Sequence, residues 1–239
     1  MKKLLLSTAT VAVLAFAVNA NAAEPGKYYV RGDAGYAIMK NNLRGNSKTT
    51  SGTTTTTSSL SIKNQNPSGF VGDIGFGYSL SDQIRTDMTF NYANLEKKVT
   101  IIDSKVTSKP RYMSLMVNAY YDIINSSEFT PYVMLGLGYA RNEFKLSKLP
   151  SSLGLIDANN NPVTSLKFKK TNSFAYQLGT GIAYKMSQDF YLDLGYKFTG
   201  FGNTKMKLKK NQLSSNSTTD FNTKSKYIHS ITAGVRFDF

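Results

Sequence analysis

The chain has 239 residues, no cysteine and a formal net charge of +14. The lack of cysteine excludes disulfide bonds, thiolate metal sites and a cysteine nucleophile. Residues 1–22 are predicted to be a signal peptide, because two lysines precede an uncharged apolar run that ends in Ala20-Asn21-Ala22, a small-residue cleavage site. No later segment offers about 18 consecutive apolar residues. We therefore expect one exported domain, residues 23–239, without a membrane-spanning helix.

After residue 22, apolar and polar residues alternate in eight segments: 28–39, 70–80, 84–92, 112–123, 129–140, 173–186, 190–199 and 229–239. Such alternation predicts strands with one apolar face. Short connections at 81–83, 124–128 and 187–189 alternate with long polar ones at 40–69, 93–111, 141–172 and 200–228. Short turns at one end and long loops at the other are typical of outer-membrane barrels. The sequence therefore predicts an all-β, antiparallel, up-and-down transmembrane barrel of eight strands, with periplasmic short turns and four extracellular loops.

Charge separates cleanly between the two faces of these segments. The apolar face carries no Asp, Glu, Lys or Arg. A Lys or Arg that faces lipid at mid-depth costs roughly 2–4 kcal/mol, whereas charges inside a narrow lumen can pair with one another. We therefore expect the charged residues of the opposite face to form a network inside the barrel: Arg31, Asp33, Asp73, Arg85, Asp87, Asp122, Lys185, Asp193, Lys197, Arg236 and Asp238.

The last segment is apolar at every second position and ends the chain on an aromatic residue, Phe239. A C-terminal strand closed by Phe is typical of bacterial outer-membrane barrels. We expect Phe237 and Phe239 to act as the assembly signal for the barrel-assembly machinery. Two other architectures stay open: a soluble eight-stranded barrel of the lipocalin kind, with its apolar face inward, and a barrel of ten strands. Residues 149–156 and 162–168 are the candidates for extra hairpin structure above the membrane.

An enzymatic function is not expected. The single histidine, His229, is followed by Ser230, and adjacent strand residues point to opposite faces, so these two cannot readily form a catalytic dyad. The sequence shows no metal-ligand cluster, no phosphate-binding glycine loop and no acidic dyad, so we expect neither a cofactor nor a metal.

The positive charge is concentrated in the four long loops. Their net charges are +3, +2, +4 and +5 in chain order, and the rest of the expected mature chain nets −2. A cationic rim attracts anionic surfaces such as lipopolysaccharide phosphates, sulfated glycans or acidic proteins. The alternative is that these lysines only keep the loops soluble or contact the cell's own lipopolysaccharide. The candidate ligand-binding residues are Lys63, Lys97, Lys98, Lys167, Lys169, Lys170, Lys205, Lys207, Lys209 and Lys210.

Three segments carry a resemblance to a known family: the glycine-rich opening strand 28–36, the run Gly136-Leu137-Gly138, and the terminal residues 233–239. In these the chain resembles the opacity-protein and surface-antigen family of small outer-membrane barrels, and especially its rickettsial surface adhesins. The resemblance implies a Gram-negative outer-membrane location and attachment to host cells, in some members through host glycans or serum and surface proteins. Nucleic acid is not expected as a partner of loops at that location. A structural barrel without a dedicated ligand and a narrow channel remain alternative functions.

Overall fold

The computed structural model describes residues 25–51, 54–101, 104–151, 157, 159, 161–202, 204–207 and 219–239, and the expected signal peptide, residues 1–22, lies outside them. The described part of the chain contains no helix that is long and apolar enough to cross a membrane. The strands are β1 (Tyr28–Ser51), β2 (Thr54–Gln65), β3 (Ser68–Ser79), β4 (Ile84–Ile101), β5 (Ser104–Asp122), β6 (Phe129–Ser147), β7 (Ser165–Lys167), β8 (Thr171–Lys185), β9 (Phe190–Phe201), β10 (Thr204–Lys207) and β11 (Thr219–Asp238).

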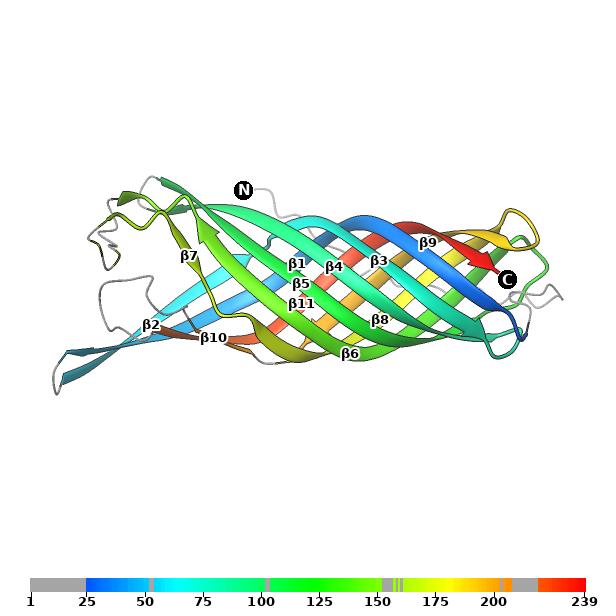
Figure 1. Ribbon diagram of the computed structural model, residues 1–239, viewed down its shortest axis with the longest axis horizontal. Helices are drawn as coiled ribbons and strands as arrows, with labels where there is room; N and C mark the ends of the chain where they lie inside the picture. The colour runs from blue at the N-terminus through cyan, green and yellow to red at the C-terminus, as the bar shows by residue number, and fades with distance from the viewer. Residues whose placement is uncertain are drawn as a thin grey trace, which may run out of the picture.

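Eight of these strands close into an antiparallel barrel in the order β1, β3, β4, β5, β6, β8, β9 and β11, and β11 pairs back onto β1 (Figure 1). The seam reaches the end of the chain. The Tyr28 amide donates to the Phe239 carbonyl at 3.0 Å, and the Phe239 amide donates to the Tyr28 carbonyl at 2.8 Å. Closure leaves no unpaired edge in the barrel wall. The predicted eight-stranded barrel is confirmed, and the ten-stranded alternative is wrong.

The apolar face of the barrel points outward. Ile74 and Ile231 are 67% and 63% exposed, whereas Arg85 and Asp122 are each 1% exposed. A soluble barrel with an apolar interior would show the reverse, so the lipocalin alternative is wrong. The exposed apolar side chains form a belt, which we take as the membrane-spanning part, over residues 28–38, 70–80, 84–92, 113–121, 129–139, 174–184, 190–198 and 227–239.

Aromatic side chains mark both edges of this belt. Near the short turns, Tyr28 stacks on Phe76 and Phe129 tilts against Tyr184, with ring centroids 5.6 and 4.8 Å apart. Near the long connections, Phe198 stacks on Tyr227 at 5.2 Å. Rings with one polar end lie favourably at both lipid–water boundaries. Tyrosine takes this place because the chain has no tryptophan.

The long connections differ from the prediction, because the strands continue well beyond the lipid belt (Figure 1). β1 and β2 pair as far as Ser51 with Thr54, and β4 and β5 as far as Ile101 with Ser104. The connection at residues 40–69, expected as a loop, is thus mostly strand. Backbone hydrogen bonds between neighbouring strands extend beyond the membrane, while the apolar alternation stops where no face contacts lipid. Of the segments expected to add hairpin structure, residues 162–168 contain only the short β7, which pairs with β6 at residues 145–147. Residues 152–156 lie outside the described residues.

Candidate functional site

The middle of the lumen holds a cluster of five charged residues. Lys197 reaches from β9 to both Asp33 on β1 and Asp73 on β3, with Nζ–Oδ2 distances of 3.1 and 2.7 Å. Arg31 also forms an ion pair with Asp33, and its Nη1 lies 3.7 Å from Asp87 Oδ2. Space here is tight, because Asp33 Oδ1 occupies the place that a Cβ at Gly234 would need. The cluster therefore ties four barrel strands together.

A second cluster lies beside it. Arg85 Nε donates to Asp122 Oδ2 at 2.6 Å, and Arg85 Nη2 donates to Asp122 Oδ1 at 2.8 Å. The Arg85 guanidinium carbon lies 4.7 Å from the centre of the Tyr120 ring. The Tyr132 hydroxyl donates to Asp193 at 2.6 Å. Aromatic rings and hydroxyls thus fill the space between the ion pairs.

A third group lies towards the short turns. Arg236 Nε lies 2.9 Å from Asp238 Oδ1, and the Arg236 guanidinium carbon lies 3.9 Å from the centre of the Tyr191 ring. Lys185 lies 6.0 Å from the centre of the same ring and is less buried than Arg236. All eleven charged residues expected inside therefore project from the inward face of their strands, and the structure brings most of them into contact with one another.

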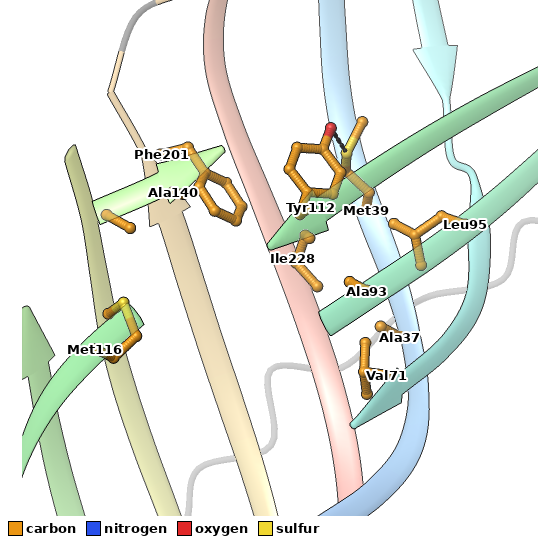
Figure 2. Close-up of a cluster of buried hydrophobic side chains, with 11 residues drawn as sticks. Ala37, Met39, Val71, Ala93, Leu95, Tyr112, Met116, Ala140, Phe201 and Ile228 are labelled. Carbon is orange, nitrogen blue, oxygen red and sulfur yellow. Dashed lines mark hydrogen bonds between the residues drawn. The ribbon is translucent and has the colours of Figure 1, made fainter. Parts of the chain in front are cut away.

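A cluster of buried apolar side chains lies on the long-connection side of the charge clusters, and Figure 2 shows its members. Tyr112 stacks on Phe201 with ring centroids 4.9 Å apart, and its hydroxyl lies 2.9 Å from the Met39 sulfur. The buried members of this apolar plug are Ala37, Met39, Val71, Ala93, Leu95, Tyr112, Met116, Ala140, Ala175, Phe201 and Ile228. The sequence analysis missed the plug, because Ala93, Leu95, Phe201 and Ile228 lie in segments that it assigned to long loops. The other members lie scattered on the face assigned to charges.

A cavity of about 40 Å³ lies between the plug and the charge clusters, lined by Asp73, Gln177, Lys197 and Phe201 among others. That volume suits a few water molecules. Side chains therefore occupy the lumen on both sides of the cavity, as expected for eight strands.

The candidate lysines spread over several strand extensions beyond the lipid belt. Lys97 and Lys98 lie exposed on β4, Lys167 lies exposed on β7, and Lys169 and Lys170 follow β7. Of the others, Lys63 belongs to β2, and Lys205 and Lys207 to β10, while Lys209 and Lys210 lie outside the described residues. The lysines of β10 belong to an extension formed with β11, and those of β4 and β7 to another formed with β5 and β6.

The register reveals a cationic group that the sequence analysis missed. Lys109 on β5 lies directly opposite Lys145 on β6, and Lys145 lies directly opposite Lys167 on β7. Arg111 and Arg141 lie on the same outward face, nearer the lipid belt. The signal in the sequence is weak, because only strand pairing shows that positions 109, 145 and 167 are neighbours.

Two acidic residues partly neutralise this surface. Glu96 forms an ion pair with Lys109, with Nζ–Oε2 3.1 Å, and Glu143 forms one with Lys170. The Lys170 ammonium lowers the pKa of the Glu143 carboxyl below its ordinary value. These pairs are largely exposed, so each is worth little in stability. The surface keeps a net positive charge.

The His229 side chain lies on the lipid-facing side of the barrel wall. Its Nδ1 lies 2.6 Å from the Tyr196 hydroxyl, and its ring contacts Phe198 edge-on with centroids 5.3 Å apart. Ser230 points the opposite way and is buried in the lumen. The two therefore do not form a dyad. Among the described residues, no group of three or more His, Asp or Glu side chains is placed to hold a metal ion.

Comparison with known proteins agrees with this architecture. Residues 8–239 match the model of the outer membrane protein beta-barrel domain. A candidate adhesin of Rickettsia conorii is 31% identical over 176 residues, which cover 71% of this chain and 68% of that protein. A candidate adhesin of Rickettsia bellii is 29% identical over the full length of both chains. Outer membrane protein PagN of Salmonella typhimurium is 26% identical, with 90% of this chain and 89% of that protein covered.

Solved structures share the fold. Neisserial surface protein A superposes with a TM-score of 0.52 at 18% identity, covering 89% of this chain and 97% of that one. OprG from Pseudomonas aeruginosa superposes with a TM-score of 0.53 at 17% identity, covering 92% of this chain and 99% of that one. At this level of identity the structures show a common barrel and nothing finer. The sealed eight-stranded wall, its lipid-facing apolar belt and the match across residues 8–239 agree: the chain belongs to the outer membrane protein beta-barrel family and to the bacterial outer membrane.

Proposed function

We propose that the protein is a non-enzymatic adhesin whose long-connection end faces the cell exterior and binds anionic molecules of a host surface. The observation that carries the proposal is the placement of positive charge. The exposed lysines of β4 and β7 and the lysine positions of β10 lie on strand extensions beyond the lipid belt. The relatives described as candidate adhesins support the same reading.

The interior offers no competing function of comparable strength. Ion pairs and aromatic rings fill the lumen, and the apolar plug lies above them. His229, the single histidine of the chain, and Ser230 face opposite sides of the wall, so neither serves as base or nucleophile for the other. Function therefore falls to the projecting extensions, where charge attracts partners over roughly 8 Å at physiological salt. Sulfated or phosphorylated glycans and acidic serum or surface proteins have the chemistry to bind there.

Charge reversal tests the proposal. Bacteria that display the barrel are compared with bacteria that display a variant with Lys205, Lys207, Lys209 and Lys210 changed to Glu, in attachment to host cells. We expect attachment to fall on the order of tenfold, and wild-type attachment to fall as salt is raised from 0.05 to about 0.5 M. The matched control changes the same four lysines to Arg, which keeps the charge and should keep attachment.

Attachment that is unaffected by both charge reversal and salt would contradict the electrostatic mechanism. Surface labelling and heat-modifiable electrophoretic mobility must show equal amounts of folded barrel for all variants. Deletion strains with leaky envelopes but normal attachment would instead favour a structural barrel without a dedicated ligand.

A further inference from the structure

β2 is the outermost strand of a sheet that stands beyond the lipid belt. It pairs with β1, β1 pairs with the extension of β11, and β11 pairs with β10, so β2 and β10 are the two ends of this sheet. Figure 1 shows it projecting separately from β5, β6 and β7. Among the described strands, β2 pairs only with β1. One side of its backbone is therefore free to pair with another chain.

Three other strand edges in the described part of the chain are guarded against such pairing. β4 continues past its pairing with β3, and this part begins with Lys97 and Lys98. β10 is four residues long and carries Lys205 and Lys207, and β7 is three residues long and ends in Lys167. Lysine and short length are common means by which proteins keep edge strands from pairing.

The β2 edge lacks such a guard. Its residues 54–62 read Thr-Thr-Thr-Thr-Ser-Ser-Leu-Ser-Ile, without charge, proline or glycine, and the first charged residue of the strand is Lys63. The β-branched residues of this run favour an extended strand. The run is about 30 Å long, and every second residue directs its backbone N–H and C=O groups away from β1. The edge therefore offers a row of backbone donors and acceptors to an incoming strand.

β1 holds β2 in the conformation that strand pairing needs. The two strands pair at consecutive positions from Leu43 with Ile62 to Ser51 with Thr54, and β11 supports the other side of β1 as far as Ser47. A strand that is already extended needs less ordering to bind a partner than a free loop does. The edge is therefore preorganised.

Charge decides which kind of strand fits this edge. Residues 41–65 carry Arg44, Lys48 and Lys63 and no Asp or Glu. β10, at the other end of the same sheet, adds two lysines. A second copy of this chain would bring the same positive charge and be repelled, whereas an acidic segment would be attracted. An anionic glycan would be attracted as well, but it has no polypeptide backbone that could pair with a strand.

We propose that the free edge of β2, at residues 54–62, docks an extended acidic segment of another protein, which adds to the sheet as a further strand. Backbone hydrogen bonds supply the binding, and the positive charge of the sheet selects acidic segments and speeds their approach. The docking site rests on the proposed function, because it requires the long-connection end to face the cell exterior. The partner at this edge is a protein rather than a glycan.

Methylated peptides separate backbone pairing from charge. Refolded full-length protein in phosphatidylcholine nanodiscs is titrated with a fluorescent peptide of alternating Thr and Glu, and with the same peptide methylated at every backbone nitrogen. Methylation keeps the charge of the peptide but removes its backbone donors. We expect the methylated peptide to bind on the order of tenfold more weakly. Equal binding of the two peptides would overturn docking by strand addition.

The double variant T56P/T57P tests the edge from the side of the protein. Adjacent strand residues direct their backbone N–H groups to opposite sides, so one of the two prolines removes a donor from the free edge, and no charge changes. We expect the unmethylated peptide to bind this variant as weakly as the methylated peptide binds the wild type. T56A/T57A keeps both donors and should bind as the wild type does. Unchanged binding in T56P/T57P, in barrels shown to be folded by heat-modifiable mobility, would overturn the site.

The remaining outcomes separate this docking edge from the adhesin proposal and from self-association. If the two peptides bind equally but charge reversal at Lys205, Lys207, Lys209 and Lys210 still reduces attachment, the docking edge is wrong and the adhesin proposal stands. If methylation weakens binding but attachment ignores charge and salt, the docking edge stands and the electrostatic adhesin mechanism is wrong. Barrels that dimerise without peptide, and lose the dimer in T56P/T57P, would replace the acidic segment by a second copy of this chain.

Discussion

Arg85 and Asp122 meet inside the barrel through two parallel hydrogen bonds of 2.6 and 2.8 Å, although 37 residues separate them in the chain. Both side chains are buried at 1% exposure, and the Tyr29, Tyr120 and Tyr132 rings surround the guanidinium. A charge in such a place is stable only with its partner.

Replacing only one residue of the Arg85–Asp122 pair should therefore lower the free energy of unfolding more than replacing both. We expect D122N to lower the free energy of unfolding by about 3–5 kcal/mol, because it leaves a buried guanidinium without its counter-charge. The double variant R85M/D122L should cost less than D122N alone. Urea unfolding in lipid vesicles, followed by the change in electrophoretic mobility, measures both. Costs that simply add would show that the two residues do not interact.

A charge on the lipid-facing side should destabilise the barrel according to its depth. Leu135 lies in the middle of the belt and Tyr139 at its edge, both exposed on β6. We expect L135R to cost roughly 2–4 kcal/mol and Y139R roughly 0–1 kcal/mol. The same unfolding assay measures the difference. Equal costs at the two positions would contradict the placement of the lipid belt.

Lys226 should make stability depend on pH. It lies on β11 beyond the lipid belt and is 4% exposed at the long-connection end of the lumen, and burial lowers its pKa from 10.5 to about 8. Because the folded state releases this proton before the unfolded state does, stability should rise between about pH 8 and 10.5, by at most roughly 3 kcal/mol. Unfolding measured across that range tests the slope. K226M should abolish it, and a slope that persists in K226M would assign the effect to other groups.

The filled lumen should not conduct ions. Ion pairs occupy its middle, and Tyr112 and Phe201 stack in the plug above them. We expect no step-like currents from purified protein in planar bilayers. Changing Tyr112 and Phe201 to Ala should also leave the bilayer silent, because the charge clusters remain. Regular conductance steps from the wild type would contradict this reading and revive the channel alternative.

The terminal aromatic should matter more for assembly in cells than for the folded barrel. The Phe239 backbone pairs with Tyr28, while its ring is exposed near Phe237 and Phe76. F239A keeps the backbone pairing and removes only the ring. We expect less folded protein in the outer membrane of expressing cells but normal refolding in detergent. Failure of refolding would assign the ring a role in stability instead.

The strand count, the face that meets lipid and the inward charges could all be predicted from sequence. Lipid imposes a strong local rule, since a charged side chain in hydrocarbon is costly and every second residue faces the hydrocarbon. The rule acts on each strand separately, so segments such as 129–140 can be assigned without knowing their neighbours. The same rule ends at the membrane edge, which is why the extensions of β1, β4 and β6 were expected as loops.

The pairing of residues across strands was decided only by the tertiary structure. Alternation fixes the face of Lys197 but not that it reaches Asp33 and Asp73, because the lumen brings together residues from strands that are not adjacent. Register likewise aligns Lys109, Lys145 and Lys167, which the sequence separates by 36 and 22 residues. The sequence by itself determined a membrane barrel, since lipid selects side chains one strand at a time. The contacts inside the barrel and the alignment of these three lysines beyond the lipid belt depend on how the closed sheet is staggered. That stagger is a property of all the strands together.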